Sequence, residues 1–344
     1  MQIRHAIVAL GLLCGTAPAS AQSVAAQDAL VSVERIWDRA PHSAFTDLVE
    51  HDGRLWCSFR EGSAHVPGTN GVARVLVSAD GMNWSSVDRV EEAGVDLRDP
   101  KLCSLPDGRL MLVMGGSVYA GSTLLRRDPR VAFLEPGAER FGPTEIAVVD
   151  PRVRGERDWL WRVSWLGEYG WGVVYQPGES EWGIQLVRTR DGRTYELVTS
   201  WELDGRPNET SLALGQDGRM VALVRREGGD RSALVGVASA PFTDWSFRPL
   251  GERLGGPHLV QLASGEWIAG GRRYAAEGAR MQLGRVDVDT GAWQHLLDLP
   301  SGGDTSYPGF VLRGERLLVS YYASHEGKAA IYLAELRAGA LRAD

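Results

Sequence analysis

The sequence NETSLALGQDGRMVALVRRE, which covers residues 208–227, contains two short apolar runs separated by a turn signal. Ser211–Leu214 and Met220–Val224 are predicted to be strands, and the Gln-Asp-Gly between them is typical of a hairpin turn. A hairpin returns the chain to the edge where it began. Glu209, before the first strand, and Arg225 and Arg226, after the second, are therefore expected at one end of the sheet. That end would carry one carboxylate and two guanidinium groups.

The same hairpin pattern recurs along the chain. A turn glycine precedes an apolar strand at Gly53, Gly108, Gly218, Gly265 and Gly314. A sixth, degenerate hairpin is predicted from the segments Trp161–Trp165 and Trp171–Tyr175. Six hairpins at a spacing of roughly 50 residues indicate a repeat architecture.

A second turn signal follows several of these hairpins. Ser78–Trp84 has the form Ser-x-Asp-Gly-x-x-Trp, and Thr189–Tyr195 is close to it. Each is predicted to be a turn after a third strand, with the aspartate capping the loop. Four strands in each of six repeats predict an all-β fold, a six-bladed β-propeller. The last repeat, Phe310–Leu336, shows only three strands, so Val31–Trp37 is expected to supply its fourth strand and close the ring.

The composition bounds the class of protein. The chain has 344 residues, a net charge of −7 and no run of basic residues, so nucleic acid is not an expected partner. Residues 1–21 resemble a secretory signal peptide, which predicts a secreted or periplasmic protein with a single domain over residues 22–344 and no membrane span. Cys57 and Cys103 lie in predicted strands, and free thiols are favoured over a disulfide. Neither has metal-ligand spacing, and no metal or cofactor is expected.

The Ser-x-Asp-Gly-x-x-Trp turn resembles the Asp-box of the sialidase (neuraminidase) superfamily, over nearly all of the mature chain. The resemblance implies that Glu209 supports a tyrosine nucleophile, that Tyr307 is this nucleophile, and that Arg225 or Arg226 grips a substrate carboxylate. Two features depart from the family. Residues 43–47 contain no arginine, and the loop over residues 61–71, where the family has its acid/base aspartate, offers only Glu61 and His65.

Counting from the turn glycines gives an independent argument for a site. Charged and aromatic residues recur at equivalent strand ends, which should lie at one face of the ring. They are Arg60, Arg98, Asp99, Arg162, Glu209, Arg225, Arg226, Arg272, Arg273, Asp304, Tyr307 and Tyr322, with His65 and His325 in neighbouring loops. Neighbouring strand residues point to opposite faces, so only one arginine of each pair can face a pocket. We expect one central depression that includes Arg60, Arg98, Glu209, Arg226, Arg273 and Tyr307.

Converging arginines bind carboxylate, sulfate or phosphate groups. The sequence therefore favours a secreted glycoside hydrolase that removes a terminal acidic sugar from an anionic oligosaccharide or polysaccharide. Asp99 and His65 are both candidates for its general acid. A polysaccharide lyase, in which Tyr307 or His65 takes a proton from a uronate, and a non-catalytic glycan-binding propeller are the alternatives.

Overall fold

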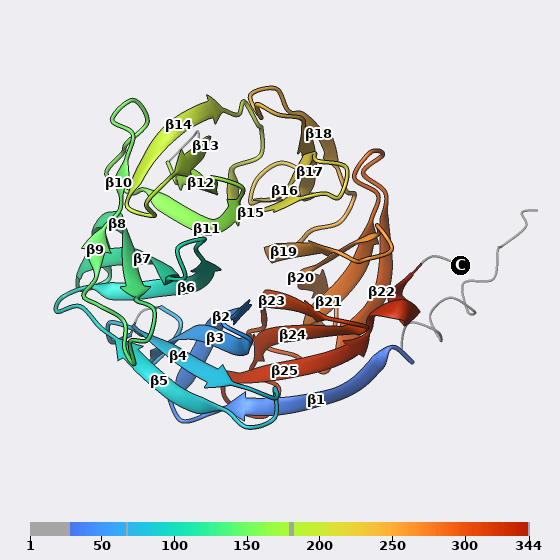
Figure 1. Cartoon of the computed structure of the whole chain (residues 1–344), viewed down its shortest axis with the longest axis horizontal. Helices are drawn as coiled ribbons and strands as arrows, with labels where there is room; N and C mark the ends of the chain where they lie inside the picture. The colour runs from blue at the N-terminus through green and yellow to red at the C-terminus, as the bar shows by residue number, and fades with distance from the viewer. Residues whose placement is uncertain (1–27, 67, 179–181, 343–344) are drawn as a thin grey trace, which may run out of the picture.

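The computed structural model describes residues 28–66, 68–178 and 182–342. Within these residues the strands form six sheets, and Figure 1 shows them arranged in a ring like the blades of a propeller. The prediction of a six-bladed, all-β propeller is confirmed. The predicted signal peptide over residues 1–21 lies outside the described residues. Among the described residues, no helix has the length and apolar character needed to cross a membrane.

The first three blades follow the chain order from their inner strand outward. Blade one contains β2 (His42–His51), β3 (Arg54–Gly62), β4 (Val72–Ser78) and β5 (Ser85–Val90). Blade two contains β6 (Asp96–Ser104), β7 (Leu110–Ala120), β8 (Thr123–Leu134) and β9 (Glu145–Ile146). Blade three contains β11 (Trp159–Leu166), β12 (Tyr169–Gln176), β13 (Gly183–Thr189) and β14 (Thr194–Ser200), with the short β10 (Val148–Val149) parallel to β14.

The remaining three blades complete the ring. Blade four contains β15 (Pro207–Leu214), β16 (Met220–Arg226), β17 (Leu234–Ala238) and β18 (Ser246–Pro249). Blade five contains β19 (Gly255–Gln261), β20 (Trp267–Ala275), β21 (Gly278–Val286) and β22 (Trp293–Leu299). Blade six contains β23 (Ser306–Arg313), β24 (Arg316–Ala323), β25 (Ala330–Arg337) and β1 (Leu30–Trp37), and a 3-10 helix, η1 (Ala338–Leu341), follows it.

The ring closes through its two ends. β1 pairs antiparallel with β25, with Val33 opposite Ala334, so the first described strand lies beside the last one (Figure 1). This pairing confirms the prediction for Val31–Trp37. Without β1, the outer edge of β25 would present unpaired backbone groups to solvent.

The hydrophobic core lies between neighbouring blades. Trp56 and Val75 of blade one pack in one cluster with Leu97 and Leu112 of blade two, and all four side chains are buried. Burying each such side chain stabilises the fold by about 2 kcal/mol. The sheets therefore pack face to face around the ring, and this packing holds the inner strands at its centre.

The predicted outer turns are present. In the turn between β4 and β5, Asp80 accepts hydrogen bonds from the backbone N–H groups of Met82 and Asn83, at 2.8 Å each. The indole of Trp84 donates to the carbonyl of Gly81 at 2.9 Å. Asp80 thus provides hydrogen-bond acceptors for the backbone N–H groups of the turn, and the Trp84 ring packs beneath the turn, away from the inner strands.

Each of the six described inner strands carries a β-bulge near its start. In every case two consecutive residues of the inner strand oppose one residue of its partner strand. The bulged pairs are Phe45-Thr46, Asp99-Pro100, Trp161-Arg162, Asn208-Glu209, Gly256-Pro257 and Tyr307-Pro308. A bulge takes residues out of the ladder and redirects their side chains. Proline, which lacks an N–H donor, is tolerated at this position for the same reason.

Backbone carbonyls displaced by the bulges accept hydrogen bonds from side chains of other blades. The Lys101 ammonium group donates to the carbonyls of Phe45 and Thr46, at 3.2 and 2.8 Å. The Thr46 hydroxyl donates to the carbonyl of Tyr307 at 2.5 Å, and the Arg162 guanidinium donates to that of Pro308 at 3.4 Å. Buried carbonyls left without donors would destabilise the fold, so these side chains are structural parts of the ring.

Cys57 on β3 and Cys103 on β6 are buried free thiols, as the sequence favoured. Burial raises the pKa of the Cys103 thiol to about 12, and burial followed by the nearby Asp47 raises that of Cys57 further. Since the thiolate is the reactive form, both cysteines should resist alkylation. We expect iodoacetamide to modify neither thiol in the native chain at neutral pH and both in denaturant, as measured by mass spectrometry of the peptides that contain Cys57 and Cys103. Modification of either thiol before unfolding would contradict this packing.

Candidate active site

The bulges bring Glu209 of β15 and Tyr307 of β23 into direct contact. The Tyr307 hydroxyl donates a hydrogen bond of 2.6 Å to Oε1 of Glu209. The two residues lie 98 positions apart in the sequence and on blades four and six, so only the closed ring can pair them. This is the carboxylate–tyrosine pair that the sequence predicted.

Three donors hold the Glu209 carboxylate in place. Besides Tyr307, the Arg225 guanidinium donates to Oε2 at 2.6 Å and the Gly256 N–H donates to Oε2 at 2.9 Å. Burial alone would raise the pKa of this carboxyl, but the Arg225 charge and the hydrogen bonds outweigh it and lower the pKa below its ordinary value. Glu209 is therefore a buried and ionised carboxylate.

Tyr307 is enclosed by aromatic and cationic side chains. Its ring lies 5.1 Å from that of Phe45 and 5.4 Å from that of Trp161, measured between centroids, and the Lys101 ammonium is 5.3 Å from its centroid. Burial, followed by the negative charge of Glu209, raises the pKa of the Tyr307 hydroxyl well above its usual value. The resting tyrosine is thus neutral and donates its proton toward Glu209.

Asp99, in the bulge of β6, is in the opposite electrostatic state from Glu209. Its side chain is buried, and its Oδ1 has no hydrogen-bond partner among the described residues. Burial raises its pKa above the ordinary value although Arg98 and Lys101 act to lower it, and the Glu209 charge raises it further. Its backbone φ of +49° lies in the left-handed region, which is costly for a residue with a side chain. Strain and an unsatisfied buried carboxyl together mark it as a functional candidate.

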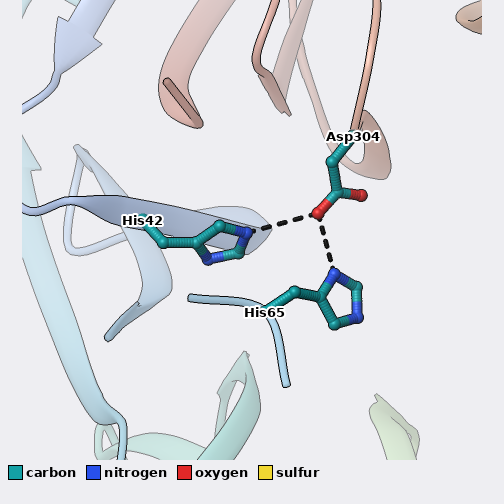
Figure 2. Close-up of side chains that lie close together, drawn as sticks. All are labelled: His42, His65 and Asp304. Carbon is teal, nitrogen blue, oxygen red and sulfur yellow. Dashed lines mark hydrogen bonds and ion pairs between the residues drawn. The ribbon is translucent and has the colours of Figure 1, made fainter. Parts of the chain in front are cut away.

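A second cluster surrounds Asp304, which lies two residues before the start of β23. Figure 2 shows the Nε2 atom of His42 and the Nδ1 atom of His65 both directed at Oδ2 of Asp304, at 3.2 and 2.8 Å. The other oxygen, Oδ1, accepts from Arg272 at 3.0 Å and from the Tyr322 hydroxyl at 2.7 Å. Blades one, five and six therefore meet at this carboxylate, and the predicted residues His65, Arg272, Asp304 and Tyr322 come together.

These contacts show which arginine of each neighbouring pair faces the ring centre. Arg225 and Arg272 face the ring centre, whereas the expectation for Arg226 and Arg273 is wrong. Arg226 donates to the carbonyl of Ser232 at 2.6 Å, and Arg273 pairs with Asp298 at 2.9 Å. The strand pleat turns each of them to the other face of its sheet.

Arg60 and His325 are also placed differently from the prediction. Arg60 is 1% exposed and pairs with Asp96 at 2.8 Å, so it supports the loop over residues 61–66 and 68–71 from within, and it lines a small cavity beside His65 instead of joining Glu209 and Tyr307. The His325 ring packs against Tyr332 of β25, the third strand of its blade, with 5.0 Å between centroids. Arg60 lies at the strand end that its offset from the turn glycine predicted, and His325 lies in the predicted loop, but local packing determines where each side chain points.

Arg162 and Arg98 lie on the inner strands, with different surroundings. Arg162 forms a buried ion pair with Asp47, a residue that the sequence did not single out, and so belongs to the floor beneath the site. Arg98 lies over the rings of Phe45 and Trp159, at 5.7 and 6.0 Å from their centroids. Its Nε atom is buried without a hydrogen-bond partner among the described residues. Arg98 is thus a guanidinium with unused donor capacity next to Asp99.

His42 and Lys101 were missed by the sequence argument. His42 lies at the start of β2. None of the predicted site residues stands at the same number of sequence positions from the turn glycine of its own hairpin. Lys101 is a single charged residue inside an apolar strand.

The sequence does contain a signal for the bulges. A proline directly follows Asp99, Gly256 and Tyr307, and it marks three of the six bulges.

Comparison with known proteins identifies solved structures with a similar fold. No family model matches the sequence, and no curated protein matches it either. A protein of unknown function from Dyadobacter fermentans has a similar structure, with a TM-score of 0.78 at 16% identity over 90% of this chain and 98% of that one. An α-L-arabinanase from Penicillium chrysogenum, solved with arabinobiose, gives a TM-score of 0.69 at 14% identity over 91% and 99%.

A mutant Trypanosoma rangeli sialidase that displays trans-sialidase activity gives a TM-score of 0.66 at 11% identity, over 91% of this chain but 60% of that one. At these identities the likeness shows a shared propeller fold.

Gly256 allows a test of how closely Tyr307 is packed. Its φ is +57°, and a methyl group there would lie 2.8 Å from atoms of the Tyr307 ring. Gly256→Ala should therefore cost about 1–2 kcal/mol for the left-handed backbone and about 1–3 kcal/mol more for overpacking. Urea unfolding of the variant and the wild type would measure the loss.

Gly251→Ala is the matched control. Gly251 has a φ of +70°, and its N–H also donates to a side-chain oxygen, that of Ser232, but no atom lies within 4 Å of an added methyl group. It should show the backbone cost alone. Equal losses in the two variants would mean that the Tyr307 ring is not confined by Gly256.

Proposed function

We propose that this protein is a glycoside hydrolase that removes a terminal acidic sugar from a glycan. The observation that carries the proposal is that the pKa values of two carboxyls, on the inner strands of blades two and four, are shifted in opposite directions. Surroundings lower the pKa of Glu209 and raise that of Asp99. Two carboxyls held in opposite protonation states are what glycoside hydrolysis requires, one to donate a proton and one to support the attack.

In this mechanism Tyr307 is the nucleophile and Glu209 its base. As the Tyr307 oxygen bonds to the anomeric carbon, its proton passes to Oε1 of Glu209, and the bond to the leaving oxygen breaks. The raised pKa of Tyr307 and the lowered pKa of Glu209 make this transfer uphill in the resting site, so it accompanies bond formation. A neutral tyrosine also avoids the repulsion between a carboxylate nucleophile and an anionic sugar.

Asp99 is the general acid of this proposal. It protonates the leaving oxygen in the first step. In the second step it takes a proton from a water molecule whose oxygen bonds to the anomeric carbon, the bond from that carbon to the Tyr307 oxygen breaks, and Glu209 returns its proton to Tyr307. His65, the other candidate from the sequence, is less suited to this role because its Nδ1 already contacts Asp304. The unpartnered Oδ1 of Asp99 leaves this carboxyl free for a substrate.

The acidic nature of the sugar is supported by Arg98. Arg225 and Arg272 each already contact a carboxylate, Glu209 and Asp304. Arg98 has no direct ion pair among the described residues and keeps a buried Nε without a partner. A carboxylate on the substrate would satisfy this guanidinium.

Tyr307→Phe and Glu209→Gln should each reduce turnover by about 10³-fold or more, because each removes part of one nucleophilic unit. The double variant should be hardly slower than either single one. The measurement is kcat on a glycan identified by screening sialosides and uronate-containing glycans for reducing ends and for the ultraviolet absorbance of an unsaturated uronate. Tyr321→Phe is the control, since its hydroxyl binds the carbonyl of Pro300, outside the site.

Near wild-type turnover by Tyr307→Phe would overturn the proposal. Products that absorb as unsaturated uronates would assign the site to a lyase instead. Binding without any turnover, retained in Glu209→Gln, would indicate a glycan-binding propeller.

The pH profile tests Asp99. A general acid must be protonated, and the raised pKa of Asp99 keeps it so at higher pH than an ordinary aspartic acid. Activity should fall as pH rises through this raised pKa, and Asp99→Asn should abolish that limb. The variant should lose about 10²–10⁴-fold on natural glycans but far less on an aryl glycoside, whose leaving group needs no proton. Equal losses on both substrates would exclude Asp99 as the acid.

A further inference from the structure

The three side chains of Figure 2, His42, His65 and Asp304, are arranged like the ligands of a metal ion. We propose that they bind one divalent transition-metal ion of the Zn²⁺ type. One ligand atom from each residue, Nε2 of His42, Nδ1 of His65 and a carboxylate oxygen of Asp304, lies within 4.8 Å of the other two. The hydrolase proposal for Glu209, Tyr307 and Asp99 does not require this site.

The spacing of the ligand atoms fits a small tetrahedral site. With bonds of about 2.0 Å, tetrahedral ligand atoms are about 3.3 Å apart. The two nitrogens lie 3.2 and 2.8 Å from Oδ2 of Asp304, so small adjustments of the His65 loop would open room for an ion. Two imidazoles and one carboxylate are a donor set that suits Zn²⁺ and neighbouring transition metals better than Ca²⁺ or Mg²⁺, which favour oxygen ligands.

The Asp304 carboxylate is already oriented as a metal ligand needs to be. Its Oδ1 accepts from Arg272 and Tyr322, and its backbone N–H donates to the Ser324 hydroxyl at 2.9 Å. These contacts leave Oδ2 facing the two imidazoles. Outer hydrogen bonds of this kind fix ligands in natural metal sites.

Two features set the expected affinity. The Nδ1 atom of His42 is buried without a partner among the described residues, and the loss of such an outer partner costs about 10–100-fold in metal affinity. Arg272 shares the charge of Asp304 and would repel the ion. We therefore expect binding that is specific but weaker than in a structural zinc site, and a metal that chelators remove without unfolding the ring.

The ion would lie beside the Glu209–Tyr307 pair. The Phe45 ring separates them, at 4.9 Å from the His65 ring and 5.1 Å from the Tyr307 ring. The His65 side chain is 45% exposed, so coordination positions not filled by the protein would face solvent. Such a site can take an oxygen of a bound glycan.

The test uses the full mature chain, stripped with a chelator and dialysed. Titration with Zn²⁺ by calorimetry should give one equivalent bound, and Co²⁺ should give the visible absorption bands of a nitrogen- and oxygen-ligated ion. His65→Ala and Asp304→Asn should each weaken Zn²⁺ binding at least about tenfold. Circular dichroism checks that both variants fold.

His295→Ala is the matched control. His295 also contacts an aspartate, Asp298, with Nε2 2.9 Å from Oδ1, but no third ligand completes a cluster there among the described residues. It should bind Zn²⁺ like the wild type. No Zn²⁺ binding by the wild type, or equal binding by wild type and folded His65→Ala, would overturn the site and leave the contacts to Asp304 as hydrogen bonds only. These readouts do not depend on hydrolysis, so they are separable from failure of the proposed function.

Discussion

The β-bulge repeated in the inner strands is the constraint on which the rest of this structure depends. It places Asp99, Glu209 and Tyr307 at the ring centre, because each of them is a bulged residue and not a regular ladder residue. It also frees carbonyls that must find donors, and Lys101, Thr46 and Arg162 provide them across blade boundaries. The candidate site and the closure of the ring are therefore maintained by the same contacts.

The arrangement carries conformational strain. Phe45, Asp99 and Tyr307 all have positive φ values, between +49° and +66°, and each costs about 1–2 kcal/mol relative to an extended backbone. The interblade hydrogen bonds and the packing of Phe45 against Tyr307 offset that cost. Strain that the surrounding structure over-determines is a way to hold reacting groups in fixed positions. It leaves little freedom for Tyr307 to move away from Glu209.

The sequence predicted the fold because each propeller repeat contains its own local sequence signals. Each hairpin has its own turn glycine and its own apolar run, so six of them and the closing pairing of Val31–Trp37 could be read without any long-range knowledge. The Glu209–Tyr307 pair was implied by the resemblance to the sialidase superfamily, and the equivalent strand ends placed both residues at one face of the ring. Arg226 and Arg273 were misplaced because the sequence does not show which residue of an arginine pair the strand pleat turns toward the ring centre, and His325 because local packing against Tyr332 determines its direction. Asp47 and His42 escaped notice because their partners, Arg162 and Asp304, are more than 100 residues away.

The central carboxylates differ in whether a guanidinium group is bonded to them. Asp47 is paired with Arg162 beneath the site, Glu209 with Arg225, and Asp304 with Arg272. Each of these three carboxylates has a guanidinium bonded to it, and the Arg225 charge lowers the pKa of Glu209 despite its burial. Asp99 has no such partner among the described residues and its pKa is raised. A buried carboxyl without a bonded cation is better tolerated when it is protonated, and this is the property that the proposed general acid would need.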